Sequence, residues 1–543
     1  MSLASAVLVG QTVTIGSGGI TNTSASDYVI NDNVQLSAHQ TWDAQAGDIV
    51  ITGDINGNYK KLTVSGSEDT TLSGVLSNLT YSNGLSKTGT GTLFLEGSNT
   101  FGGTVSFQSG TVELSHNNAL GSSTWGNTVQ SGAALALSGG ITVTEGSFNI
   151  AGNGTGSGSL VNVSGNNTFS SSLTLTGDAI FTSAQDTMTL NQTVSQGNYD
   201  LTLQGSGNWN VSSNVGANSG GTLYLSGDGN TSMSGNLNVS GGVVIDNHGT
   251  TDLSGNLNLG SSSLTIQGNS NATLTGGQVN ASGGLVISDN ASANISNTLN
   301  LGGADITLSS AGTIALSGSQ INVGNIALTG AGETTFATQI NANSFTQTGS
   351  GTTTFSGTGN NYFGSVSLEG GTIISNQDGV AFHTNDLTAN NVDLQFASDN
   401  QIPAWTEVTL EDNVSLYLNG TSQTWDQLTI TGNSVIDFGA GNGSLTIGSL
   451  VIDSSANLTI LNWQNEDGTF DVFNAQIDAS GSTPNITFSG GGGGVWDPVT
   501  GDIVPVGVVP EPESYGAVFM GLSLWGWLAV SRRSHRTRRA DRS

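Results

Sequence analysis

The sequence predicts an all-β fold, a single long right-handed parallel β-helix (β-solenoid) followed by a short C-terminal transmembrane helix. Apolar positions recur every 20–21 residues, Gly accounts for 80 of the 543 residues, and only 9% of the residues are charged. Many short strands joined by glycine-rich turns account for this composition, whereas a disordered chain would carry more charge. One continuous apolar stretch near the C-terminus accounts for the predicted helix.

Two apolar series share the period of the predicted coil. The first series has one member in each of seven successive repeats of the pattern: Met233, Leu253, Leu274, Ile295, Leu316, Phe336 and Phe355. The second series runs between these positions as pairs two residues apart: Val243/Ile245, Leu264/Ile266, Leu285/Ile287, Ile306/Leu308 and Ile326/Leu328. Alternation at i and i+2 is typical of β-strands, and a fixed period near 21 residues is typical of a solenoid. Each turn of the coil should therefore contribute at least two strands.

The residue types of the body agree with stacked parallel turns. Equivalent residues of neighbouring turns lie about 4.8 Å apart, so a repeated charge would face its own copy, whereas Ser, Thr and Asn can pair with theirs. Gly and Asn provide the positive φ of tight corners, and no Pro occurs before Pro403. We expect the coil to extend over residues 1–489, although the spacing in 115–230 is too irregular to predict single turns. About 22 turns would form a rod about 100 Å long.

The body of the chain is strongly acidic. Before Ser531 the basic residues are Lys60, Lys61 and Lys87, against 38 acidic residues (39 in the chain, less Asp541), a formal charge of −35. Such a polyanion is repelled by nucleic acid, so no nucleic-acid partner is expected. The chain has no Cys, which excludes disulfides and thiolate metal sites.

A longer unit occurs twice, at residues 85–114 and 345–374. The first copy, LSKTGTGTLFLEGSNTFGGTVSFQSGTVEL, carries Lys87, Asn99–Phe101 and an ordered series of glycines. It resembles the autotransporter-associated β-strand repeat, which implies β-helix turns of an exported surface protein. The second copy departs from the pattern, with Gln347 in place of the lysine and one extra residue before Tyr362.

The C-terminal region predicts a membrane anchor. The stretch Tyr515–Val530 is uncharged and would form a helix about 24 Å long, short for a bilayer core of about 30 Å. The anchoring side chains are Tyr515, Phe519, Leu522, Leu524, Trp525, Trp527 and Val530. Arg532, Arg533 and Arg536 follow as a basic stop, and residues 534–543 form a basic tail that should remain cytoplasmic. An amphipathic or core helix is the alternative.

The order of features in residues 509–533 resembles the PEP-CTERM sorting signal of Gram-negative bacteria. Pro510, Glu511 and Pro512 precede the apolar stretch, and a Gly/Pro-rich tether is expected over residues 490–508. The resemblance implies a transient inner-membrane anchor that a partner, a membrane-embedded exosortase, processes for delivery to the surface or the exopolysaccharide matrix. Exopolysaccharide or other surface components are then expected partners. Because no basic residue occurs before Lys60, we also expect a signal peptide upstream of Met1 or a different start.

The sequence predicts a protein that is not an enzyme and has no cofactor or metal. The body contains His39, His116, His248 and His383 as scattered single residues, and Asp246 with His248 is its best small cluster. The alternative is a β-helix enzyme that degrades polysaccharides, which would need paired carboxylates or a base with cationic partners. The predicted function is therefore a non-catalytic structural or adhesive protein of the surface or the exopolysaccharide-containing, biofilm-associated matrix.

Overall fold

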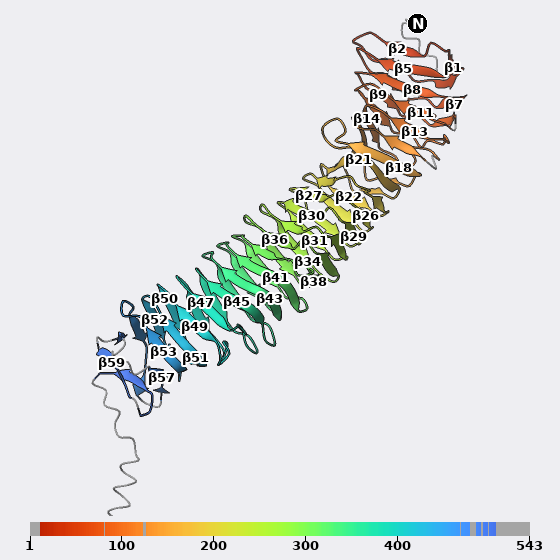
Figure 1. Ribbon diagram of the computed structural model, residues 1–543. Coiled ribbons are helices and arrows are strands. Elements are labelled where there is room, and N and C mark those ends of the chain that lie inside the picture. The colour runs from red at the N-terminus through yellow and green to blue at the C-terminus, as the bar shows by residue number, and fades with distance from the viewer. Residues whose placement is uncertain are drawn as a thin grey trace, which may run out of the picture.

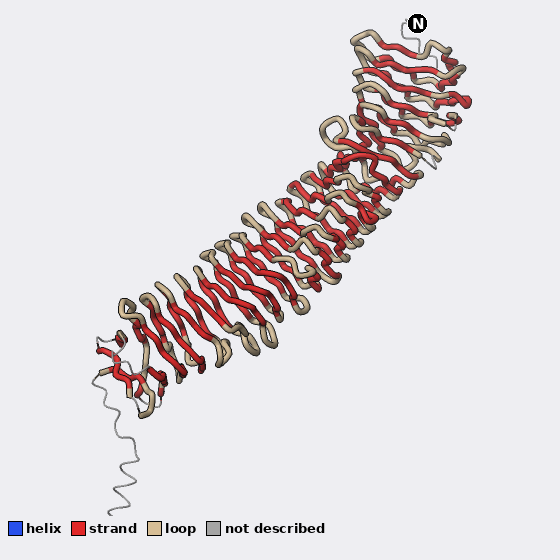
Figure 2. Tube along the Cα trace, in the orientation of Figure 1, coloured by secondary structure: helices blue, strands red, loops and turns tan. Residues whose placement is uncertain are grey.

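The chain coils into one long, bent rod whose successive turns are stacked in sequence order (Figure 1). The computed structural model describes residues 11–80, 82–122, 126–466, 469–477, 485–489, 492–497 and 499–506. Within these ranges the regular elements are strands, and no helix occurs (Figure 2). The all-β parallel solenoid predicted from the period is therefore confirmed, while its right-handed sense stays a prediction. None of the described residues belongs to a helix able to cross a membrane, and the predicted helix 515–530 lies outside them.

The first apolar series forms one face of the coil, here called face one. Its central strands are β28 (Thr231–Met233), β31 (Thr250–Leu253), β34 (Asn271–Leu274), β37 (Ser292–Ile295), β40 (Thr313–Leu316), β42 (Glu333–Phe336) and β44 (Thr352–Phe355). Each member of the series pairs in parallel with the next, from Met233 with Leu253 to Phe336 with Phe355. All seven side chains are buried, so the predicted register is confirmed residue by residue.

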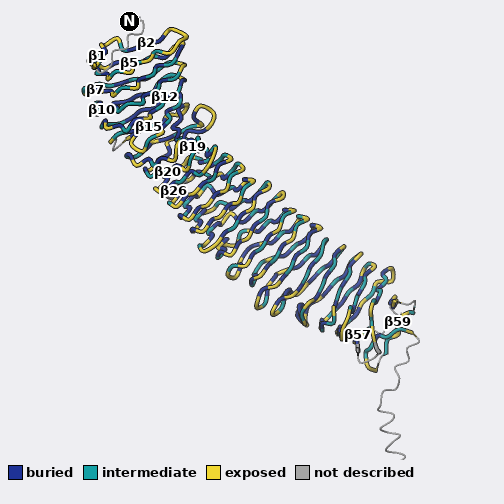
Figure 3. The backbone as a smooth tube through the Cα atoms, turned by 180° about the vertical axis from the view of Figure 1, so that it is seen from behind, coloured by how far each residue is buried: buried dark blue, intermediate teal, exposed yellow. Residues whose placement is uncertain are grey.

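The second apolar series forms another face, here called face three. Its strands are β30 (Val243–Asn247), β33 (Leu264–Ile266), β36 (Leu285–Ile287) and β39 (Ile306–Leu308), which lead to the end of β41 (Ile321–Leu328). The pairs stack in the predicted order, from Val243 on Leu264 to Ile306 on Ile326. The residues of this series are buried and alternate with less buried ones. Figure 3 shows buried and more exposed residues alternating along the whole rod.

A third strand in each turn, which the two series did not identify, forms face two between the other faces. It comprises β29 (Leu237–Val239), β32 (Leu257–Gly260), β35 (Gln278–Ala281) and β38 (Thr298–Asn300). At β41, β43 (Ile340–Gln347) and β45 (Tyr362–Leu368), single long strands span faces two and three, whereas the next two turns have short strands on face three, β47 (Asp386–Ala389) and β49 (Glu407–Leu410). Face two carries the candidate site described below.

The coil is irregular around the first repeat copy. Face one begins as a four-stranded sheet of β1 (Thr12–Ile15), β4 (Asn33–Leu36), β7 (Ile55–Lys60) and β10 (Leu76–Leu79). It becomes strand again at β17 (Thr142–Val143) and β20 (Asn167–Phe169), where the step between turns is 26 residues, from Thr142 to Thr168. Longer and unequal turns explain why the period could not be followed through 115–230.

The C-terminal end of the rod changes from parallel to antiparallel pairing. The strands β58 (Ile486–Phe488), β59 (Gly492–Trp496) and β60 (Ile503–Pro505) pair antiparallel in sequence order. The indole Nε1 of Trp496 donates a hydrogen bond to the Ala475 carbonyl of the last turn at 2.9 Å. The described residues of the segment predicted as a tether, 490–508, therefore include two strands that pack on the rod.

Candidate binding groove

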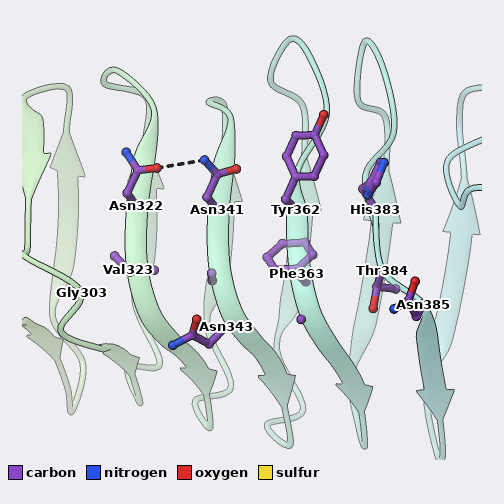
Figure 4. Close-up of a pocket in the computed structure, with 12 residues that line it drawn as sticks. Gly303, Asn322, Val323, Asn341, Asn343, Tyr362, Phe363, His383, Thr384 and Asn385 are labelled. Atoms are coloured by element: carbon purple, nitrogen blue, oxygen red, sulfur yellow. Dashed lines mark hydrogen bonds between the residues drawn. The ribbon is translucent and has the colours of Figure 1, made fainter.

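An open groove of about 560 Å³ runs along face two in the C-terminal half of the rod (Figure 4). It is lined by Gly303, Asn322, Val323, Asn341, Ala342, Asn343, Tyr362, Phe363, Gly364, His383, Thr384 and Asn385. These residues come from five successive turns, with β41, β43 and β45 at the centre. The groove therefore follows the axis of the rod.

A ladder of asparagine amides leads along face two into the groove. Amide nitrogens donate to the side-chain oxygen of the preceding turn in four pairs: Asn258 to Asn238 at 2.7 Å, Asn280 to Asn258 at 2.7 Å, Asn300 to Asn280 at 2.8 Å and Asn341 to Asn322 at 2.9 Å; Asn300 and Asn322 are paired in the backbone ladder. The next register position is Tyr362, which pairs with Asn341 in the backbone ladder. Asn341 Oδ1 is buried and receives no hydrogen bond from the described residues. The ladder therefore stops at the groove.

Three aromatic side chains continue the line of the asparagines along the rod. The ring centroids of Tyr362 and His383 lie 4.4 Å apart, and those of His383 and Trp405 lie 5.1 Å apart. Tyr362 is 42% exposed and Trp405 is 55% exposed. Figure 4 shows the ring of Tyr362 broadside to the viewer and that of His383 close to edge on. We call Tyr362, His383 and Trp405 the aromatic row.

Packed phenylalanines fill the core behind the groove, and Phe363 is the one that lines it. Phe355 lies 5.5 Å from Phe336, 5.3 Å from Phe345 and 5.0 Å from Phe382, measured between ring centroids. Phe363, the inward neighbour of Tyr362, lies 5.5 Å from Phe345. Because side chains alternate along a strand, burying Phe363 directs Tyr362 outward.

A buried asparagine fixes the backbone immediately before Tyr362. Asn361 Oδ1 accepts the backbone N–H of Ile340 at 3.0 Å, and its Nδ2 donates to the Ala381 carbonyl at 3.2 Å. One fully buried side chain thus connects three successive turns beneath the groove. Buried amides with both ends satisfied hold a local structure firmly.

The groove offers polar but uncharged chemistry. Its lining contains four asparagines and one threonine, and no Asp, Glu, Lys or Arg. Amides and hydroxyls both donate and accept hydrogen bonds, so they suit ligands rich in hydroxyl groups. The fold brings these residues together from positions 21 or so apart, and an outward series Asn341, Tyr362, His383, Trp405 was the signal in the sequence that could have identified them.

The structure separates the small cluster predicted from Asp246 and His248. His248 Nδ1 lies 2.7 Å from Asp228 Oδ1 of the preceding turn, and both side chains are more than half exposed. Asp246 instead accepts a hydrogen bond from Gln267 Nε2 at 3.0 Å. Of the other predicted histidines, only His383 lies in the groove.

The remaining predictions from the sequence are the sorting signal and the expectation of no metal site. Among the described residues no group of three His, Cys, Asp or Glu side chains could hold a metal ion. The predicted sorting motif Pro510, Glu511 and Pro512 lies outside the described residues. The same is true of the predicted anchor residues and basic stop: Tyr515, Phe519, Leu522, Leu524, Trp525, Trp527, Val530, Arg532, Arg533 and Arg536.

The first repeat copy holds a buried lysine. Lys87 is 1% exposed, and its Nζ donates to the carbonyls of Thr88 at 3.1 Å and Gly89 at 2.8 Å. Gly110, at φ 72°, lies so close that a Cβ atom there would come within 2.6 Å of Nζ. Burial lowers the pKa of Lys87 to about 8, and the Asp69 carboxylate offsets part of this effect.

Gln347 occupies the corresponding place in the second copy. Its Nε2 donates to the carbonyls of Gly351 at 3.1 Å and Gly370 at 3.0 Å, while its Oε1 accepts the Thr353 hydroxyl at 2.6 Å. Thr353 stands where the first copy has Leu93. An ammonium group has only donors, whereas an amide also has an acceptor that must be satisfied when buried. The change from Lys87 to Gln347 therefore requires the change from Leu93 to Thr353, whose hydroxyl satisfies the buried amide oxygen.

A second buried contact is shared by the two repeat copies. In the first copy, Asn99 Oδ1 accepts the N–H of Leu76 at 2.7 Å and Nδ2 donates to the Ala119 carbonyl at 2.6 Å. Asn361 makes the equivalent pair of bonds in the second copy. The repeat thus specifies two buried side chains, at Lys87/Gln347 and Asn99/Asn361, which connect neighbouring turns where the coil turns a corner.

The buried ammonium of Lys87 makes stability depend on pH. In the folded chain the group loses its proton near pH 8, whereas in the unfolded chain it does so near pH 10.4. The unfolded state holds more protons between these values, so stability should rise with pH from 8 to about 10.5, by on the order of 1–3 kcal/mol. Below pH 8 the lysine is protonated in both states, so the full cost of burying its charge lowers the stability. The measurement compares wild type with the double variant Lys87→Gln/Leu93→Thr, and a constant difference across this range would contradict the prediction.

Residues 85–114 and 345–374 match the family model described as passenger-associated-transport-repeat. The two matches coincide with the two repeat copies predicted from the sequence, so this part of the resemblance is confirmed. The resemblance of residues 509–533 to the PEP-CTERM signal stays a prediction. No curated protein and no solved structure matches the chain. Two segments of the coil are thus similar to repeats of transported passenger domains.

Proposed function

We propose that this chain is a non-catalytic structural or adhesive protein of the cell surface or extracellular matrix of a Gram-negative bacterium. The observation that carries the proposal is the pair of passenger-associated repeats within one parallel coil. A long rod whose surface carries many Ser, Thr and Asn side chains besides its acidic residues separates its two ends and offers an extended face for attachment. Both features fit an exported, surface-associated protein.

The proposed route of delivery uses the C-terminal signal. Residues 515–530 would hold the chain transiently in the inner membrane, and an exosortase would act at Pro510–Pro512. Prolines outside the membrane resist helix formation and would keep this motif extended and accessible. The acidic body, with three basic residues before Ser531, would then lie outside the cytoplasm.

Changing Pro510, Glu511 and Pro512 together to alanine should leave the chain at full length in the inner membrane. The measurement is fractionation of a host that contains an exosortase, with protease added to intact cells to detect rods at the surface. A matched control changes Pro498 and Pro505 to alanine, which leaves the motif intact and should leave processing unchanged. Surface delivery of the triple-alanine chain would contradict the proposed sorting route, and a wild-type rod retained in the cytoplasm would contradict the proposed function.

A further inference from the structure

We propose that the groove on face two binds a neutral polysaccharide chain, which lies along the rod and packs sugar rings against Tyr362 and Trp405. The inference rests on the proposed adhesive function and assigns its ligand class. It depends on three features of the described residues: the shape of the groove, the absence of charge in its lining, and the aromatic row at the end of the asparagine ladder.

The shape of the groove suits a linear ligand. Its lining comes from five successive turns, at Gly303, Asn322, Asn341, Tyr362 and His383. Four steps between turns correspond to about 19 Å along the axis. An extended chain of a few sugar units can occupy this length, whereas a compact small molecule would leave most of it open.

The polar groups of the groove favour an uncharged ligand. The body of the chain is a polyanion, yet the lining includes no acidic or basic side chain apart from the imidazole of His383. An acidic polysaccharide would be repelled by the surrounding carboxylates, and a cationic polymer would bind along the whole rod rather than here. Hydroxyl groups of a neutral sugar both donate and accept, as do the amides of Asn343 and Asn385.

The aromatic row provides apolar surface of a kind that sugar rings use. The C–H groups on one face of a pyranose carry partial positive charge, and the face of an aromatic ring is negative, so the two attract each other. The exposed face of Tyr362 borders the groove, and Trp405 extends the row by one further turn beyond His383. Large amphipathic rings on a rigid support commonly dominate the binding energy of a site.

The row is placed where the asparagine ladder ends. An asparagine at residue 362 would continue the ladder and give the buried Asn341 Oδ1 a donor. A buried acceptor that lacks its hydrogen bond costs about 1–3 kcal/mol of stability. A tyrosine at this position therefore leaves the buried acceptor without a donor while creating an exposed ring. Positions where a local stabilising interaction is absent are commonly functional.

The natural ladder provides the decisive variant, Tyr362→Asn. Asparagine is the residue found at this register position in Asn322 and Asn341 of the two preceding turns, so the variant should fold with a stability within about 1 kcal/mol of wild type. It removes the ring and keeps the backbone. Trp405→Ala is the second variant, and Tyr224→Ala, which removes a tyrosine of similar exposure from β27 (Leu223–Gly227), is the matched control.

The experiment measures binding of neutral oligosaccharides to the full-length chain. The probes are hexasaccharides of α- and β-linked glucose and of mannose, with oligogalacturonate as the acidic comparator, and the readouts are calorimetry and protection of tryptophan fluorescence from quenching by acrylamide. At least one neutral probe should bind wild type and Tyr224→Ala equally. Tyr362→Asn and Trp405→Ala should each weaken its binding tenfold or more, and the acidic probe should not bind.

The outcomes separate this inference from the proposed function. Failure of every neutral probe to bind, or equal binding by Tyr362→Asn, overturns the groove as a saccharide site even if the rod still reaches the cell surface. Recovery of shortened probes would support the site and overturn the proposal of a non-catalytic protein. Wild-type binding that both groove variants lose, with intact probes recovered, supports the inference.

Discussion

Replacing Phe355 with alanine is expected to lower the free energy of unfolding of its part of the rod by about 3–5 kcal/mol. Its ring is fully buried and contacts Phe336, Phe345 and Phe382 in the core behind the groove. In a solenoid each turn contacts only its neighbours, so the loss should stay local. Hydrogen exchange should accelerate in β42, β44 and β45, while the N-terminal turns keep their protection.

The control for this prediction is another phenylalanine of the same fold. Phe94 lies in β12 (Thr92–Leu95) between the buried Leu93 and Leu95, so its ring faces outward and is half-buried. Phe94→Ala should cost less than about 1 kcal/mol. Equal losses for the two variants, or a uniform rise in exchange along the whole rod after Phe355→Ala, would show that the packed phenylalanines are not a local element.

Exchanging the buried polar pair between the repeat copies should give strongly non-additive effects. Lys87→Gln alone places an amide oxygen opposite Leu93, where it has no donor, and should cost about 1–3 kcal/mol. Leu93→Thr alone buries a hydroxyl without an acceptor and should cost a similar amount. The double variant reproduces the arrangement of Gln347 with Thr353, in which the hydroxyl donates to the amide at 2.6 Å, and should recover most of both losses.

A double-mutant cycle measures this coupling directly. The expected interaction energy is about 2 kcal/mol, obtained from chemical unfolding of wild type, both single variants and the double variant. Phe94→Ala, which changes an outward position of the same strand, combined with Lys87→Gln should give additive losses. Additive losses for Lys87→Gln with Leu93→Thr would mean that the two copies differ for unrelated reasons.

The period of the sequence allowed the fold to be predicted with residue-level register. The pairs Met233 with Leu253 and Val243 with Leu264 stack as the spacing requires. This succeeded because a parallel coil repeats a local pattern, so each buried position is marked by its own alternation. The corners were predictable for the same reason, since the non-glycine residues with positive φ in the described part are Asn or Asp, except Tyr59.

The two apolar series did not identify the third strand as a separate face of the coil, because its signal is weaker. The segment SGNLNV, residues 234–239, contains only two apolar residues, Leu237 and Val239. Asn238 between them is a residue type that is typical of turns. In the fold, Asn238 and its equivalents lie mid-strand because their amides pair along the rod, as Asn258 does with Asn238 at 2.7 Å. A side chain that is unfavourable in an isolated strand is thus favourable in a stack of copies.

The sequence alone determined the strand alternation on two faces, the turn length and the two repeat copies at 85–114 and 345–374. Only the tertiary structure decided what happens where the repetition stops. Tyr362, His383 and Trp405 lie 21 and 22 residues apart in the sequence, and stacking brings their ring centroids to 4.4 and 5.1 Å. The pairing of His248 with Asp228 instead of Asp246 was decided in the same way. Side chains two residues apart on a strand share a face but lie further apart than side chains of adjacent turns, which are about 4.8 Å apart, so contacts across turns determine the chemistry of the surface.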